Sequence, residues 1–155
     1  MSSEDATMPS LTETELQGLA ARFESAAIPK QEWTHAAHLA IGLWHVHRYG
    51  REEALPRLRT GIRRLNDAHG TLNTPTGGYH ETVTRAYVEL FADLLTAAPP
   101  GVSLADTLRI ILAGPLGARH VLLRHYSRER LFSPEARASW IEPDLRPLAA
   151  ADHRS

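Results

Sequence analysis

The fold of this chain is decided first by residues 33–50, which read WTHAAHLAIGLWHVHRYG. Thr34 is a residue type that caps the start of a helix, and Gly50 is a type that ends one. At about 100° per residue, one stripe of this helix carries His35, His38, Gly42, His45 and Tyr49. His47 lies away from the stripe and is expected at the surface. The stretch therefore predicts a helix over 35–49 that gathers several imidazoles and one glycine on one face.

The same helical period continues through the rest of the chain, without strand-like alternation. Thr12 and Glu15 form a capping-box pattern that opens a first helix, expected to end near residue 27. Further helices are expected over 52–69, 79–98, 104–113 and 116–126, with a short one after Ser133-Pro134-Glu135. These patterns predict an all-α fold, an irregular single-domain bundle of six or seven helices over residues 11–148. Residues 1–10 are predicted to be a disordered leader and residues 149–155 a flexible tail.

Length and composition limit the classes of function. The 155 residues suffice for one domain that buries about two-thirds of its unfolded surface. The net charge of -1 gives no electrostatic reason to bind nucleic acid or an anionic membrane, so a small molecule or a protein is the expected partner. The chain has no cysteine, which fits a reducing cytoplasm and leaves metal binding to His, Asp, Glu and water. Because it also lacks an apolar run of about 20 residues and a secretory leader, a soluble, cytoplasmic protein is expected.

A second motif, YHETVT at residues 79–84, opens the helix expected over 79–98. On that helix His80 falls on the apolar face, and Thr84 falls at its edge, where it is a candidate ligand-binding residue. A buried imidazole needs partners for its ring nitrogens, because an unmade interior hydrogen bond costs about 1–3 kcal/mol. Glu81 falls off the apolar face. It suits the role of a cap and dipole residue of the first turn better than that of a catalytic base, and both roles stay open.

The histidines of the two motifs suggest a metal site. His35 and His38 stand one turn apart on one helix, and His80 would approach from another. Three neutral imidazoles with an open coordination position suit a divalent transition metal such as zinc, iron, manganese or copper. The leading hypothesis is therefore a metal-dependent enzyme that acts on a small molecule, with Glu81 as the candidate general base.

Two alternatives remain open, because histidines at this spacing are by themselves ordinary hydrogen-bonded residues. In the first, the protein is a metal-free binder whose histidines, with Tyr79 and Arg124, hydrogen-bond an organic ligand. In the second, it is a structural or interaction module, and Phe91 and Leu95 could serve a homodimer.

Two further segments bear on a pocket. A basic patch formed by His120, Arg124 and His125 either binds a carboxylate or only solvates a helix end. The segment 71–78 is rich in Thr, Gly, Asn and Pro, and it directly precedes His80. We expect this loop to cover the pocket and to move when a ligand binds, because its glycine pair supplies backbone freedom.

The two histidine motifs also carry a resemblance to known proteins. With Trp33–Leu39 and Tyr79–Thr84, the chain resembles a family of small, all-helical bacterial proteins of unassigned function. The recurring pattern of that family is aromatic-x-His-x-x-His-Leu followed by Tyr-His-Glu-Thr-x-Thr. The resemblance covers most of the chain from Phe23 onward. It implies that both motifs belong to one recurrent constellation and that Tyr126 and Arg137 line the same pocket.

Overall fold

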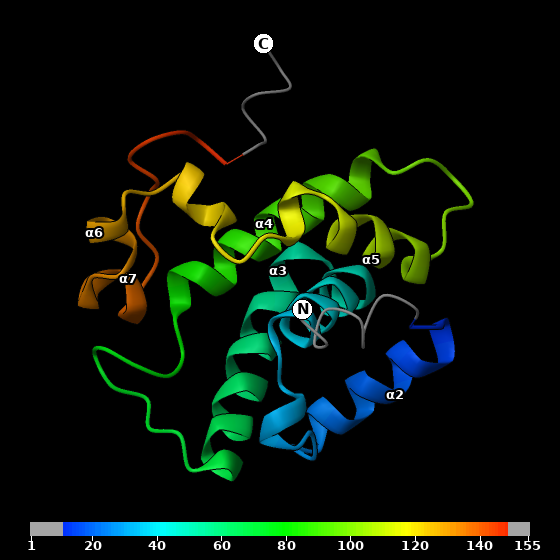
Figure 1. The fold of residues 1–155 in the computed structure, drawn as a ribbon, viewed down its shortest axis with the longest axis horizontal. Helices are drawn as coiled ribbons and strands as arrows, with labels where there is room; N and C mark the ends of the chain where they lie inside the picture. The colour runs from blue at the N-terminus through cyan, green and yellow to red at the C-terminus, as the bar shows by residue number, and fades with distance from the viewer. Residues whose placement is uncertain (1–10, 149–155) are drawn as a thin grey trace.

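Residues 11–148 of the computed structural model form a bundle of helices around one long central helix (Figure 1). Its α-helices are α2 (Glu13–Glu24), α3 (His35–His69), α4 (Glu81–Ala97), α5 (Leu104–Ala113), α6 (Arg128–Leu131) and α7 (Pro134–Ala138). Short 3-10 helices are η1 (Lys30–Glu32), η2 (Pro115–Gly117) and η3 (Val121–Arg124). Within these residues the only extended pairing is an isolated bridge between Thr74 and Gly77. The predicted all-α class is confirmed; the predicted leader, 1–10, and tail, 149–155, lie outside the described residues.

The helix starts agree with the capping residues found in the sequence. Thr12, Thr34, Ser103 and Ser133 each accept a hydrogen bond from a backbone N–H in the first turn of the helix that follows. Thr12 and Glu15 make the full reciprocal capping box. These contacts satisfy N–H groups that have no partner within the helix, which is why they could be predicted from short patterns.

The central helix α3 consists of the two segments expected on either side of Gly50. Gly50 adopts φ 83° and ψ 168°, which is not helical, so the chain bends there. A positive φ is accessible to glycine without a steric penalty. A second left-handed glycine, Gly70, ends α3 with φ 74° and ψ 18°. Although α3 is the longest helix, neither it nor another helix within residues 11–148 is long and apolar enough to span a bilayer.

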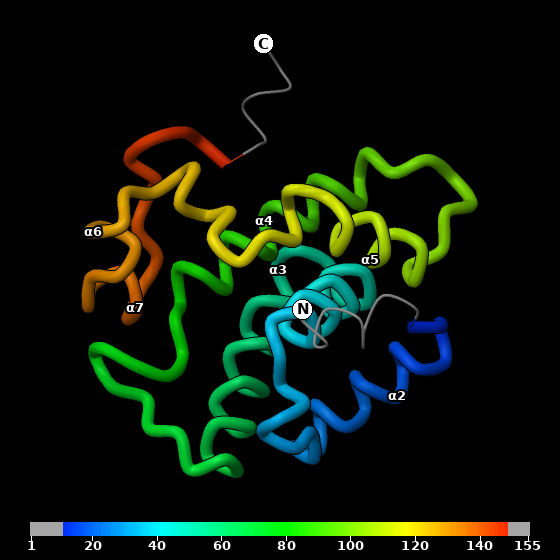
Figure 2. The backbone as a smooth tube through the Cα atoms, viewed as in Figure 1, coloured from blue at the N-terminus to red at the C-terminus, as the bar shows by residue number. Residues whose placement is uncertain are grey.

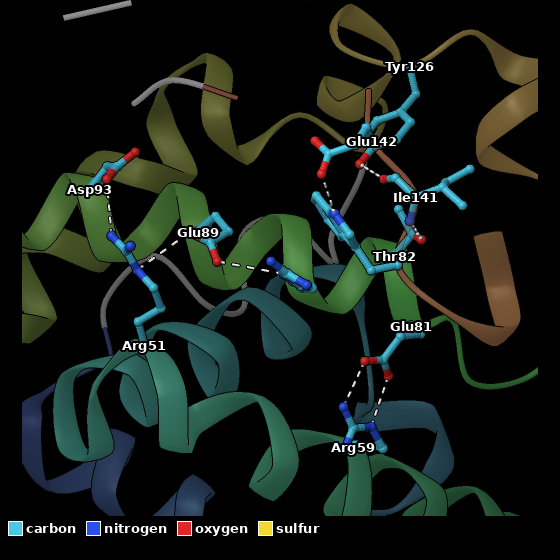
Figure 3. Close-up of polar contacts among 11 residues, drawn as sticks. Arg51, Arg59, Glu81, Thr82, Glu89, Asp93, Tyr126, Ile141 and Glu142 are labelled. Carbon is cyan, nitrogen blue, oxygen red and sulfur yellow. Dashed lines mark hydrogen bonds and ion pairs between the residues drawn. The ribbon is translucent and has the colours of Figure 1, made fainter. Parts of the chain in front are cut away.

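Helix α4 lies between α3 and the C-terminal segment and packs on both (Figures 1 and 2). The core shared with α2, α3 and α5 includes Leu16, Phe23, Leu43, Leu65, Phe91 and Leu108. A second core, shared with the segment after η2, includes Ala86, Leu90, Val121, Leu122, Tyr126 and Leu131. Burial of a large apolar side chain contributes about 1.5–3 kcal/mol, so α4 is held from two sides. Arg51, just after the bend in α3, also pairs with Glu89 and Asp93 of α4 (Figure 3).

The first core contains Phe91, and this corrects one prediction. Phe91 is completely buried, so it cannot belong to a homodimer surface as predicted. Leu95, the second residue of that prediction, packs partly buried against the same core. A Cβ added at Gly42 of α3 would lie 3.4 Å from Phe91 Cε2, which is ordinary contact, so the packing of α3 against α4 does not require a glycine here.

The prediction of a single helix over residues 116–126 is wrong. The chain forms η2 and η3 instead, separated by residues 118–120, of which Ala118 has an extended backbone at φ -68° and ψ 143°. Gly117 lies so close to the end of α5 that a Cβ there would be 2.4 Å from the Ile111 carbonyl oxygen. This close backbone packing fixes a tight turn, and short 3-10 pieces are the usual form of such connectors. The short helix α6, which follows, was not predicted.

Candidate binding cavity

A cavity of about 660 Å³ lies between α3, α4 and the connector that follows α5. Small-molecule sites have volumes of roughly 300–1,000 Å³, so this cavity is of suitable size. Its apolar wall comes chiefly from Leu39, Leu58, Val83, Val88, Phe91 and Leu122. Its polar side chains include Thr34, His35, His38, Thr84, Tyr87 and Arg119, with Gln31 and His120 beside them. The arrangement is that of a mainly apolar pocket with a small polar set.

His35 and His38, two of the three predicted metal ligands, line this cavity from the first turn of α3. His38 Nδ1 lies 2.7 Å from the Thr34 carbonyl oxygen, and His35 Nε2 lies 3.0 Å from the Gly117 carbonyl oxygen. Because a carbonyl oxygen only accepts, each of these ring nitrogens carries the hydrogen. The neutral ring of His38 therefore has its lone pair on Nε2, where it can accept a hydrogen bond.

Trp33 stacks on the ring of His38, with ring centroids 3.9 Å apart and an interplanar angle of 29°. His38 keeps exposed surface, and it lines the cavity. Desolvation lowers the pKa of His38 to about 4; the charges of His35 and Arg119 act in the same direction, and the hydrogen bond to Thr34 opposes them. His38 is therefore neutral at pH 7.

His80, the third predicted ligand, is not part of this cavity wall. It adopts φ -132° and ψ 107°, so it precedes α4 as its N-cap and does not lie on the helix face where the sequence pattern placed it. Its Nδ1 accepts from the Val83 N–H at 3.1 Å, and its Nε2 donates to the Leu131 carbonyl oxygen at 2.7 Å. Both ring nitrogens are engaged by the protein itself.

The predicted three-histidine ligand set is therefore not assembled. Residues 11–148 contain no group of three or more His, Asp or Glu side chains placed to hold a metal ion. His35 and His38 line one cavity. His80 instead caps the start of α4 and bonds to the Leu131 carbonyl oxygen. The predicted transition metal therefore has no set of ligands among the residues that the structure describes.

Glu81, the candidate general base, links α4 to α3 (Figure 3). Its carboxylate accepts from Arg59 Nε at 2.9 Å and Nη2 at 2.7 Å, and from the Tyr79 hydroxyl at 2.7 Å. Partial burial alone would raise the pKa of Glu81, but the Arg59 and Tyr79 hydrogen bonds and the Arg59 charge outweigh it and lower this pKa. A carboxylate engaged in this way is a weak base, so the contacts favour the structural role. Neither Glu81 nor Tyr79 lines the cavity.

Of two other predicted ligand-binding residues, one lines the cavity and the other does not. Thr84 lines the cavity, and its hydroxyl donates to the His80 carbonyl oxygen at 2.9 Å. Arg124 is exposed at the end of η3 and is not part of the wall. The expected helix over 116–126 would have given Arg124 a different direction from the one that the 3-10 turn gives it.

Tyr126 and Arg137 are also outside the cavity wall. Tyr126 is fully buried in the second core, and its hydroxyl donates to the Ile141 carbonyl oxygen at 2.7 Å (Figure 3). Arg137 Nη1 donates to the Gly78 carbonyl oxygen at 2.9 Å. Both residues tie the C-terminal segment to the rest of the domain and do not face a ligand.

Among the polar wall residues that the sequence patterns did not indicate are Tyr87 and Arg119. Tyr87 falls on the apolar face of α4, where a side chain is expected to belong to the core. Burial raises the pKa of Tyr87 to about 12, so its hydroxyl stays a hydrogen-bond donor at neutral pH. Arg119 precedes His120, which was placed in the basic patch, and this adjacency was the one available signal.

The loop over residues 71–78 does not line the 660 Å³ cavity, so the prediction that it covers this cavity is wrong. The Asn73 side chain accepts from Asn66 Nδ2 at 3.0 Å and from the Tyr79 N–H at 2.9 Å, which holds the loop at the end of α3. A smaller cleft of about 320 Å³ is bordered by Thr71 and Gly78 and shares Trp33, His38 and Ile62 with the cavity. The loop thus approaches His38 from the other side, and its movement stays a prediction.

Comparison of this chain with protein-family models, with curated proteins and with solved structures gives no match, so its function is argued from its own side chains.

Proposed function

We propose that this protein binds an apolar organic small molecule in the cavity between α3 and α4, through contacts made by its own side chains. The observation that carries the proposal is a cavity of about 660 Å³ whose wall is mainly apolar and holds a few polar groups. In such sites, apolar surface removed from water contributes roughly 25 cal/mol per Å² to binding. The polar groups then decide how the ligand is oriented.

Two wall residues supply hydrogen-bonding groups of opposite kind. Neutral His38 offers an acceptor at Nε2, because its Nδ1 hydrogen is directed to Thr34. Tyr87 offers a hydroxyl donor, because a phenol is protonated at neutral pH. The hydroxyls of Thr34 and Thr84 are engaged with the backbone. A ligand with one polar group on an apolar body would match this supply.

The metal-dependent enzyme predicted from the sequence fits these contacts less well. His80 would have to give up one of its two hydrogen bonds, to Val83 through Nδ1 or to Leu131 through Nε2, before that nitrogen could bind an ion. Each interior hydrogen bond left unmade costs about 1–3 kcal/mol. Glu81 would also have to leave Arg59 to act as a base. The alternative of a binding protein requires neither change.

The proposal is tested with N-phenyl-1-naphthylamine, a neutral probe that fluoresces in apolar sites. Val83→Trp adds an indole to the cavity wall, and Leu72→Trp adds the same indole at a position that is 77% exposed and outside the wall. We expect the unaltered protein and Leu72→Trp to bind the probe equally. Val83→Trp should bind it about tenfold more weakly, which corresponds to about 1.4 kcal/mol.

Circular dichroism establishes that the two variants are folded before their affinities are compared. Absence of binding to the unaltered protein, or equal binding by folded Val83→Trp, would refute the proposed function.

A further inference from the structure

We infer that the ligand of this cavity carries a hydroxyl group that donates a hydrogen bond to His38 Nε2, as an alcohol or a phenol can, an inference that rests on the proposed binding function. Two polar groups of the cavity wall leave room for a ligand. Within residues 11–148, no group donates to His38 Nε2, and none bonds to the Tyr87 hydroxyl. Both residues line the cavity.

The local structure holds the His38 ring so that Nε2 acts as an acceptor. The Nδ1 hydrogen is donated to the carbonyl oxygen of Thr34, the N-cap of α3, at 2.7 Å. Trp33 covers one face of the ring, with centroids 3.9 Å apart. Turning the ring to exchange its two nitrogens would break the bond to Thr34. A ligand group that meets Nε2 must therefore be a hydrogen-bond donor.

This requirement separates the common polar groups of organic molecules. A ketone, an ether or a carboxylate has no hydrogen to donate and would face the Nε2 lone pair with its own lone pairs. An ammonium group can donate, but among the described residues of the cavity wall there is no Asp or Glu to balance its charge. A hydroxyl group is neutral and donates to Nε2, and its oxygen remains available as an acceptor for a donor such as the Tyr87 hydroxyl.

Isothermal titration calorimetry with 1-octanol, 1-methoxyheptane and octanoate tests this assignment. The alcohol and the ether contain the same atoms, but only the alcohol can donate a hydrogen bond. His38→Phe keeps an aromatic ring beside Trp33 and removes the acceptor, whereas His38→Gln keeps an acceptor oxygen. His47→Phe is the matched control, because His47 is an exposed histidine of the same helix that does not line the cavity.

We expect the unaltered protein to bind 1-octanol about fivefold more tightly than 1-methoxyheptane, as for one hydrogen bond. Octanoate should bind more weakly than 1-octanol. His38→Phe should abolish the preference for the alcohol over the ether, and His38→Gln should keep part of it. His47→Phe should keep all of it. Circular dichroism checks that each variant is folded.

Equal affinities of the unaltered protein for 1-octanol and 1-methoxyheptane would overturn the hydroxyl assignment without the use of any variant, and would leave the cavity as a binding site. A preference for the alcohol that survives in folded His38→Phe would overturn the role of His38. Tighter binding of octanoate than of 1-octanol would overturn the assignment in favour of an acid. If none of the three probes binds, the inference fails. The N-phenyl-1-naphthylamine titration then decides separately whether the proposed function fails as well.

Discussion

His38 and His80 differ in what their ring nitrogens do, although both come from motifs that looked equivalent in the sequence. Each ring makes a hydrogen bond to a backbone carbonyl oxygen. The second nitrogen of His80 caps α4 by accepting from Val83, whereas His38 lines the cavity and stacks on Trp33. The two rings therefore have different chemistry: one completes a helix start, and the other can receive a ligand.

Because the pKa of His38 falls from 6.5 to about 4 on folding, the unfolded chain binds more protons between these pH values. The contribution of His38 to stability is therefore fully present above pH 6.5 and is lost as the pH falls toward 4. His38→Gln removes this titration. We expect it to flatten the dependence of the urea midpoint on pH between about 6.5 and 4, as followed by circular dichroism.

His47→Gln is the control for this prediction, because His47 is exposed on the same helix. The pKa values of His45 and His80 are also lowered, mainly by desolvation, so part of the pH dependence should remain. The same flattening in both variants would contradict the assignment to His38.

Two glycines of α3 show how closely neighbouring elements approach it. A Cβ at Gly42 would lie 3.4 Å from Phe91 of α4, which is ordinary contact. A Cβ at Gly61 would lie 2.3 Å from the ring of Phe23, which is buried and stacks on Trp33. Both positions are helical, so alanine gains about 1 kcal/mol of helix propensity at either one.

We predict opposite effects on the free energy of unfolding for these two glycines. Gly42→Ala should raise it by up to about 1 kcal/mol, because the helix gains propensity without a clash. Gly61→Ala should lower it by about 1–3 kcal/mol, because the fully packed Phe23 ring must shift. Urea denaturation measures both values. Similar effects at the two positions would show that the approach of α2 to Gly61 is looser than described.

The elements that were predicted correctly differ from the others in the range of their interactions. The cap at Thr34 and the bend at Gly50 depend on contacts and dihedral angles within a few residues. The failed helix over 116–126 depends on the packing of Gly117 against the end of α5. A periodic pattern carries no information about such a contact.

The whole domain is closed by the C-terminal segment, which returns to the start of α4 (Figure 3). The hydroxyl of buried Thr82 donates to the Ser139 carbonyl oxygen at 2.9 Å and accepts from the Ile141 N–H at 3.2 Å. The Tyr126 hydroxyl holds the Ile141 carbonyl oxygen. The two Thr82 bonds join parts of the chain that are 57 and 59 residues apart.

We predict that Thr82→Val, which keeps the shape but removes the hydroxyl, lowers the free energy of unfolding by about 1–3 kcal/mol. It should also speed amide hydrogen exchange at Ile141. Thr96→Val is the matched control, because its hydroxyl bonds only to Ala92 within α4, and it should change stability by no more than about 0.5 kcal/mol. Equal losses from the two substitutions would argue against closure through Thr82.

The helical class, most helix starts and the bend in α3 follow from local sequence patterns, because caps, glycine dihedrals and apolar periodicity act over a few residues. The sequence motifs also include His35, His38 and Thr84, which line the cavity. The packing of the helices, in contrast, makes His80 a cap, pairs Glu81 with Arg59, and adds Tyr87 and Arg119 to the cavity wall. These outcomes depend on which distant carbonyl, cation or helix each side chain meets when α3, α4 and the connector pack together, and a local pattern does not contain that information.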